Sequence, residues 1–338
     1  MRINSIASYN LSKPLFRQSQ FVKVNQPSCD VVSFSGQKKK AGKNSADSNI
    51  NFGIKTGNKV LETLSKTNSK DAVLPILARR LPEVSIHTAE EISNTAVAKD
   101  TFVAYFESTL NDDFSLGNRK MFLDLAPFKY DDELEKLTFA LDIAHESTHA
   151  EQVNSGRDSE FYKKISKGNP KYAGAVIALG KCVFQLMDSC FQKNMVSKTF
   201  LNYEDMSLFS KYGREIPRES DVSKHTLLKN GNFNSQGEFF KEVNGAFEAA
   251  YVKTLQYIVQ NPQDADETLI NALYDVIRDN KQKELMADVK KECCYLAESE
   301  LEARKTESKL AKEYLKTTKP INIDAYIALY DMMAGALQ

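Results

Sequence analysis

His145, Glu146 and His149 form the pattern H-E-x-x-H in the middle of this chain. On an α-helix, residues four apart lie one above the other, so both imidazoles can reach a single metal ion. Zinc is the metal that this arrangement favours. Glu146 leaves the helix axis on a neighbouring side, where its carboxylate can act as a general base towards a metal-bound water. The pattern therefore predicts a zinc centre with hydrolytic chemistry.

The segment before the pattern predicts a helix that turns both histidines inward. Leu134, Leu137 and Leu141 recur at helical spacing, and the same stripe continues to His145 and His149. The chain has only four histidines, and two of them are in the pattern. The alternative is a buried helix whose histidines are satisfied by hydrogen bonds alone.

Through 145–149 and the apolar residues before it, the chain resembles the zincin metallopeptidases over residues 101–156. In the metzincin branch the motif continues as H-x-x-G-x-x-H, but Gln152 and Ser155 stand at those positions here. The resemblance is therefore to the gluzincins, whose third zinc ligand is a glutamate on a later helix. It implies a zinc metallopeptidase that hydrolyses peptide bonds through a metal-bound water, with Glu146 as the general base.

Glu300 is the first candidate for the third ligand. The segment 281–316 reads as one helix, and Glu300 stands in its apolar stripe with Leu285, Val289, Cys293, Leu296, Ala303 and Leu310. An unpaired buried carboxylate is costly, so Glu300 should meet a cation there. The run from Glu300 to Arg304 also resembles the E-x-x-A-[D/N] signature of several gluzincins, with Arg304 at the position that usually holds Asp or Asn.

Three other residues remain alternatives for this ligand. Glu248 shares a stripe with Val252, Leu255 and Val259 in a helix predicted over 237–260. Glu302 falls on the polar face of its helix with Glu298 and Lys305, which favours a solvated charge. His225 is eligible as a ligand or as the group that stabilises a tetrahedral oxyanion, and Tyr203 and Tyr212 are eligible for the second role.

Two strands are predicted before the motif helix. The segment 101–107 is rich in β-branched and aromatic residues, 111–118 has turn residues, and 119–125 reads as a second strand. The resemblance implies that the edge strand of this sheet binds an extended substrate, and it nominates Met121 to Leu125. The motif helix should begin near Asp131–Glu133 and end near Ser155–Gly156.

These elements indicate an α+β fold that is predominantly α, zincin-like, with a small β-sheet before the H-E-x-x-H helix and a helical C-terminal part. Helical periodicity recurs over 171–195, 237–260, 267–279, 281–316 and 323–337. We expect residues 1–56, rich in Asn, Ser, Lys and Gln, to be a disordered low-complexity tail. The metallopeptidase domain would then cover 57–338, with the β-containing part and the motif helix in 57–156 and the helical part in 157–338.

The composition of the chain bears on its functional class and on its location in the cell. The 45 basic residues equal the 45 acidic ones, which gives a nucleic-acid role no support. The sequence has neither the apolar core of a secretory signal peptide nor eighteen consecutive apolar residues. Its five cysteines lack C-x-x-C spacing, as expected of reduced thiols, so we expect a cytoplasmic protein.

The sequence thus favours a zinc metallopeptidase with a peptide or protein substrate. One alternative is a zincin-like binding or regulatory module with little or no general proteolysis. The other is a helical interaction protein in which the H-E-x-x-H pattern is accidental.

Overall fold

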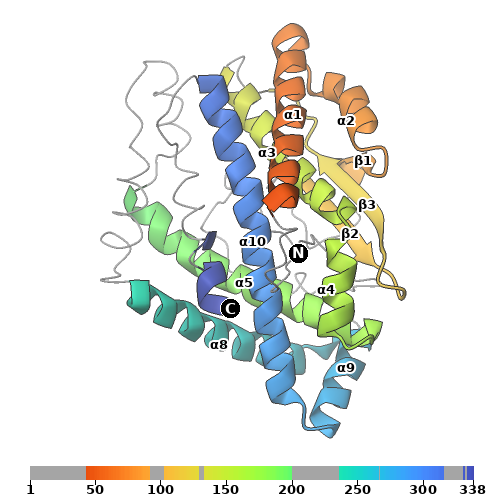
Figure 1. Ribbon diagram of the computed structural model, residues 1–338, viewed down its shortest axis with the longest axis vertical. Coiled ribbons are helices and arrows are strands. Elements are labelled where there is room, and N and C mark those ends of the chain that lie inside the picture. Colours follow the sequence, from red (N-terminus) through yellow and green to blue (C-terminus); the bar gives the residue numbers. More distant parts are fainter. Residues whose placement is uncertain are drawn as a thin grey trace.

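The computed structural model describes residues 43–91, 103–128, 133–199, 236–265, 267–315, 330–331 and 333–338. In these residues helices dominate, and a small three-stranded sheet lies to one side of them (Figure 1). The predicted fold class, α+β and predominantly α, is confirmed at this level. In this part of the chain no helix is long and apolar enough to cross a membrane.

Of the helices whose bounds the structure describes, five lie close to the predicted ranges, and the other three, over residues 43–67, 74–80 and 157–165, were not predicted. The helices are α1 (Lys43–Thr67), α2 (Leu74–Arg80), α3 (Glu133–Asn154), α4 (Arg157–Ile165), α5 (Pro170–Thr199), α8 (Gln236–Gln260), α9 (Glu267–Arg278) and α10 (Gln282–Leu315), with short 3-10 turns η3 (Lys70–Val73), η4 (Ala89–Glu91) and η7 (Pro262–Asp264). The motif helix α3 ends next to Gly156, whose φ of 72° is the left-handed conformation expected at that end. The helix predicted over 323–337 lies mostly outside the described residues.

The sheet contains β1 (Ser85–Thr88), β2 (Ala104–Leu110) and β3 (Leu116–Leu123) in the order β1-β3-β2. β3 runs antiparallel to β2 and parallel to β1. The prediction that Met121 to Leu125 forms a substrate-binding edge was therefore wrong, because β3 is the central strand of this sheet. The four-residue β1, too short to give a periodic signal, covers its second side. β2 is the edge strand that remains next to α3.

The predicted boundary of the N-terminal tail at residue 56 was also wrong. Residues 43–56 belong to α1, and Ile50 and Ile54 are buried. Two glycines in the same helix explain why its apolar face was missed, since glycine weakens a helix signal. A Cβ at Gly53 would meet Thr148 Oγ1 at 2.2 Å, and one at Gly57 would meet Leu310 Cδ2 at 2.3 Å. These glycines let α1 pack closely against α3 and α10. Residues 1–42 lie outside the described residues.

The motif helix α3 is enclosed by elements from distant parts of the chain. It packs against α1, against α10 and against β2 (Figure 1). α10 runs along much of the long axis in Figure 1 and also packs on α5, which in turn contacts α8 and α9. Leu137 and Leu141 of α3 are buried, as the stripe predicted. The fold therefore buries the H-E-x-x-H segment between the sheet and two long helices.

Candidate metal centre

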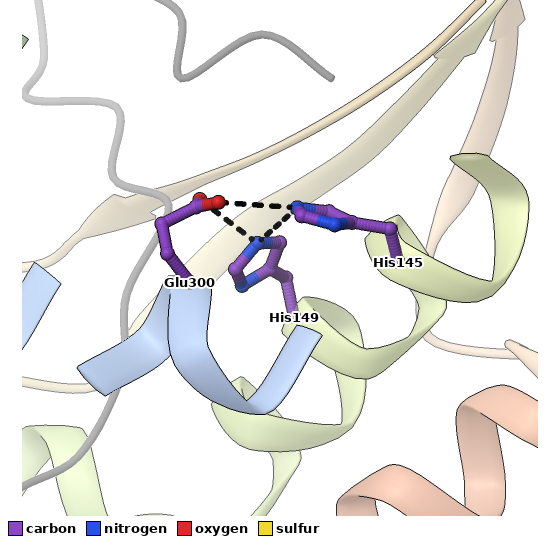
Figure 2. Close-up of side chains that lie close together, drawn as sticks. All are labelled: His145, His149 and Glu300. Carbon is purple, nitrogen blue, oxygen red and sulfur yellow. Dashed lines mark hydrogen bonds and ion pairs between the residues drawn. The ribbon is translucent and has the colours of Figure 1, made fainter. Parts of the chain in front are cut away.

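His145, His149 and Glu300 meet in the core, two from α3 and one from α10 (Figure 2). Each is at most 2% exposed. The two Nε2 atoms lie 3.0 Å apart. Glu300 Oε2 is 3.6 Å from Nε2 of His145, and Glu300 Oε1 is 3.4 Å from Nε2 of His149. Among the described residues this is the group of histidine, cysteine and acidic side chains that could hold a metal ion.

The spacing of these donors fits a tetrahedral zinc site. Zinc bonds of about 2.0–2.1 Å at tetrahedral angles place neighbouring donor atoms about 3.3 Å apart. The three separations of 3.0, 3.4 and 3.6 Å lie around that value. Three protein donors with a fourth position left over are the pattern of catalytic zinc sites, whereas structural sites usually have four protein ligands.

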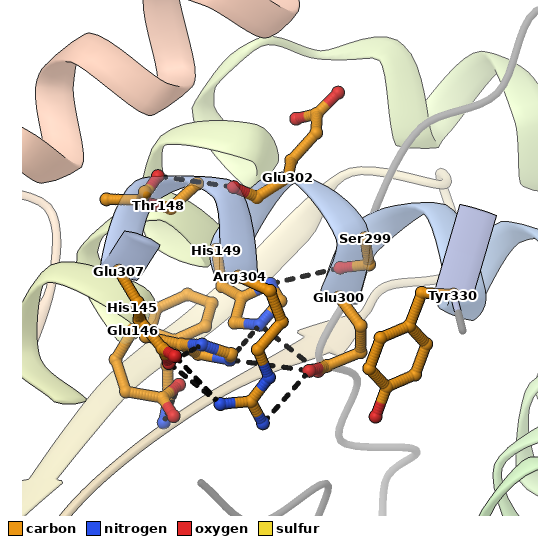
Figure 3. A network of polar contacts seen from close by, with 12 residues as sticks. His145, Glu146, Thr148, His149, Ser299, Glu300, Glu302, Arg304, Glu307 and Tyr330 are labelled. Carbon is orange, nitrogen blue, oxygen red and sulfur yellow. Dashed lines mark hydrogen bonds and ion pairs between the residues drawn. The ribbon is translucent and has the colours of Figure 1, made fainter. Parts of the chain in front are cut away.

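His145 is oriented by a second carboxylate of α10. Its Nδ1 donates to Oε1 of Glu307 at 2.5 Å (Figure 3). With the proton on Nδ1, the lone pair of Nε2 points towards His149 and Glu300. A carboxylate behind a histidine in this way fixes the tautomer and increases the basicity of the ligating nitrogen.

His149 is oriented by neutral groups instead. Its Nδ1 lies 2.8 Å from Oε1 of Gln152 and 3.0 Å from Oγ of Ser299. The amide of Gln152 is itself held, since its Nε2 donates to Oε2 of Glu302 at 2.9 Å. Both histidines therefore present Nε2 to the centre. Two facing lone pairs beside a carboxylate repel one another unless a cation or a proton lies between them.

Glu300 is a buried carboxylate that lacks ordinary partners. Neither of its oxygens accepts a hydrogen bond in the described part of the chain, and its contacts are the longer ones to His145, His149 and Arg304. Burial opposes its charge, but these contacts outweigh burial and hold the pKa of Glu300 well below its usual value. An acceptor that is charged, buried and otherwise unsatisfied fits a metal ligand.

The same groups determine the protonation of His145. Burial and Arg304 lower its pKa, but the carboxylates of Glu307 and Glu300 outweigh both and raise the pKa of His145 to about 10. A proton on this imidazole compensates the acidic surroundings as a cation would, and metal binding would release it.

Glu146 directly follows His145 in α3, lies beside it in Figure 3 and is 2% exposed. Its Oε2 accepts a hydrogen bond of 3.0 Å from the backbone N–H of Phe106 in β2. The carboxylate is therefore held between the motif helix and the edge strand of the sheet. Its position next to His145, outside the group of three candidate donors, is compatible with a general base.

The other predicted ligands lie elsewhere. Glu302 is half-buried and accepts from Asn49 at 3.2 Å as well as from Gln152, so it supports His149 from outside the donor set. Glu248 is exposed on α8. The stripe assigned to it was wrong, because Val252 and Val259 are 50% and 78% exposed. Three further candidates lie outside the described residues: His225, Tyr203 and Tyr212.

Four residues of the centre were not predicted from the sequence. They are Gln152 and Ser299 behind His149, and Arg304 and Glu307 beside His145. Tyr330, which lies beside Glu300 in Figure 3, donates to Asp188 at 2.9 Å. Glu307 follows Glu300 by seven residues on α10 and so shares its face, which was a usable signal. The pairing of Gln152 with Glu302 depends on how α3 and α10 meet, which the sequence alone does not give.

Comparison of this chain with protein-family models, with curated proteins and with solved structures gives no match.

Proposed function

We propose that this protein is a zinc-dependent metallopeptidase of the zincin type. The observation that carries the proposal is the convergence of His145, His149 and Glu300 at distances suited to zinc, with Glu146 beside them. The net charge of the surroundings agrees with a divalent ion. With His145 neutral, as a metal ligand must be, Glu146, Glu300 and Glu307 supply three negative charges and Arg304 one positive charge, which leaves two negative charges to neutralise.

In this proposal His145, His149 and Glu300 hold the ion. When bound, zinc supplies a Lewis acid that polarises the scissile carbonyl and makes water a better nucleophile at neutral pH. Glu146 takes the proton from the attacking water and passes it to the leaving amine nitrogen. Glu307 and Gln152 keep Nδ1 of each histidine protonated, so that both Nε2 atoms stay directed at the ion.

The substrate would bind along β2. This strand forms an edge of the described sheet, and its Phe106 N–H faces Glu146 instead of β3. Six of the seven residues of β2 are buried, so an extended peptide would gain backbone hydrogen bonds at this edge, beside the base, only after the groups that cover the edge move away. We therefore expect a peptide or protein substrate bound in an extended conformation.

A second candidate is a zinc-stabilised binding module that cleaves little or nothing. Deep burial favours it, because all three donors and Glu146 are at most 2% exposed. A metal that serves only the fold would leave Glu146 without a catalytic task. The two candidates agree on metal binding and differ on hydrolysis.

Two measurements test the proposal. Metal analysis of the purified chain should give close to one zinc per molecule, and His149→Ala should lose most of it. A peptide-library digest should show cleavage by the wild type that Glu146→Gln loses. Equal zinc in wild type and His149→Ala would refute the metal centre. Zinc binding with no cleavage of any peptide would favour the binding module.

A further inference from the structure

Arg304 is a fully buried arginine in the same centre, one turn of α10 beyond Glu300. Its Nη1 donates to both oxygens of Glu307, at 2.8 and 3.1 Å. Its Nη2 lies 3.5 Å from Oε2 of Glu300. One guanidinium group therefore spans a carboxylate of the donor set and the carboxylate that accepts from His145 (Figure 3).

The spacing on α10 makes this bridge possible. Glu300, Arg304 and Glu307 follow one another at intervals of four and three residues, which places them on one face of the helix. The planar fork of an arginine can contact two carboxylates at once, whereas a lysine ammonium is a point charge. Burying a guanidinium carries a large desolvation cost, so its contacts with these two acids must compensate for it.

We propose that Arg304 is a positioning residue of the metal centre. It holds Glu307 against Nδ1 of His145 and holds Glu300 opposite the two imidazoles, so that the donors are already arranged for a zinc ion. The inference rests on the metal centre of the proposed function, but it does not require peptide hydrolysis. Arg304 stands where the signature noted above usually has Asp or Asn, so this arrangement departs from that signature.

A positioning role and a purely electrostatic role for Arg304 predict opposite changes in zinc affinity when Arg304 is replaced. A cation repels another cation, so loss of the Arg304 charge alone would tighten zinc binding. Loss of a group that orients metal ligands usually weakens affinity by about 10- to 100-fold. We expect the second effect to dominate, because the charge of Arg304 is already compensated by the two carboxylates that it contacts.

The test is Arg304→Met, with Arg80→Met as the matched control. Arg80 hydrogen-bonds Thr56 and the backbone of Phe52 and makes no contact with the centre. Zinc affinity is measured by competition with a chromogenic chelator, and the geometry by the visible absorption of the Co²⁺-substituted protein. We expect Arg304→Met to bind zinc about 10- to 100-fold more weakly and to change the cobalt spectrum. A folded Arg304→Met with equal or tighter zinc binding and the wild-type spectrum would overturn the inference.

Further variants keep the test decisive if Arg304→Met does not fold. Arg304→Lys retains the charge but cannot bridge both acids, so it should fold and still bind zinc more weakly than wild type. In a double-mutant cycle, Arg304→Met should have a much smaller effect on zinc affinity when Glu307 is already Gln. Fully additive effects, or wild-type affinity in Arg304→Lys, would refute positioning through Glu307.

These outcomes are distinct from failure of the proposed function. A wild-type protein that binds zinc but hydrolyses no peptide would refute the peptidase and leave the role of Arg304 intact. Unchanged affinity in the Arg304 variants would refute the positioning role and leave the peptidase intact.

Discussion

The backbone N–H of Phe106 donates a hydrogen bond of 3.0 Å to Oε2 of Glu146. Phe106 lies in β2, where it pairs with Met121 of β3, and Glu146 lies in α3 between the two histidines of the motif. The register of the sheet decides that this N–H points away from β3 and towards the helix. The orientation of the proposed base therefore depends on a strand about forty residues earlier in the chain, as well as on the helix that carries it.

The first prediction concerns this base. Glu146→Gln keeps the size of the side chain and a carbonyl oxygen that can accept from Phe106, so zinc content and thermal stability should stay close to wild type. Hydrolysis should fall by about 10²- to 10⁴-fold, because an amide cannot take the proton from water. Glu151→Gln, on the same helix but outside the centre, is the control. Cleavage by Glu146→Gln within about tenfold of wild type would exclude Glu146 as the base.

The second prediction concerns the third ligand. Glu300→Gln should lower zinc affinity by more than about 100-fold, because a neutral amide replaces a charged donor. The exposed Glu248→Gln is the control and should retain zinc under the same mild chelation, whereas Glu302→Gln, which alters only the support of Gln152 behind His149, should lose less affinity than Glu300→Gln. Metal content and melting temperature are measured together, since loss of a buried charge alters stability as well. Retained zinc in Glu300→Gln would show that the ion is held by other residues.

Helical periodicity predicted that His145, His149 and Glu300 face the interior, because it reports which face of a helix a residue occupies. His145 and His149 continued the buried stripe of α3, and Glu300 continued that of α10. A carboxylate in an apolar stripe is informative, since its burial needs a partner. The same reasoning failed for Glu248, whose stripe with Val252 and Val259 faces solvent. An apolar stripe therefore identifies one face of a helix, but it does not show whether another part of the protein packs against that face.

What the sequence could not give are the contacts between elements. The hydrogen bond from His145 to Glu307 and that from Gln152 to Glu302 each join α3 to a residue about 150 positions later. Those contacts depend on where two helices cross, which periodicity within either helix does not specify. The helix α1 was missed for a related reason. Gly53 and Gly57 reduce local helix propensity. They favour the fold only because they leave room for the helices that pack against them, which the local sequence does not show.

The third prediction tests that helix contact. Gly53→Ala adds a methyl group that would lie 2.2 Å from Thr148 Oγ1 and 2.7 Å from the carbonyl oxygen of Ala144. Overpacking of this kind usually costs about 1–3 kcal/mol, which should exceed the gain of about 1 kcal/mol in helix propensity. Since Ala144 and Thr148 flank the motif histidines, zinc affinity should fall as well.

Gly245→Ala is the matched control for this change. Gly245 lies in α8, and a Cβ there would meet nothing within 4 Å. The same substitution should therefore stabilise the protein by about 0.5–1 kcal/mol through helix propensity alone. Chemical denaturation of both variants gives the comparison. Equal stabilisation by the two substitutions would show that α1 does not pack closely on α3.

The fourth prediction concerns Glu292, a buried carboxyl group of α10 outside the metal centre. Its Oε1 accepts from the hydroxyl of Tyr162 at 3.1 Å, and its side chain fills the space left by Gly180. Burial raises the pKa of Glu292 to about 8, with Asp158 adding to the shift, while Tyr162 and Lys181 oppose it. At neutral pH this group should therefore be protonated in the folded protein.

The sign of the pH dependence follows from that pKa. Below its usual value of 4.5, Glu292 holds its proton in both the folded and the unfolded chain, and its contribution to stability is fully present. As pH rises from 4.5 towards 8, the unfolded chain releases this proton while the folded chain keeps it, so the free energy of unfolding falls. Above about 8 both states are ionised and the loss is complete. The total is on the order of a few kcal/mol.

Glu292→Gln removes the contribution of Glu292 to the pH dependence of stability, because glutamine has nearly the same shape, can accept from Tyr162 and does not titrate. The free energy of unfolding is measured for both proteins by chemical denaturation between pH 4.5 and 9. Other groups titrate in that range, but they do so in both proteins, so the difference between the two curves reports Glu292 alone. The variant should gain stability relative to wild type as pH rises towards 8, and the difference should then level off. Parallel curves across the whole range would show that Glu292 titrates at its usual value, and that its burial carries no cost in ionisation.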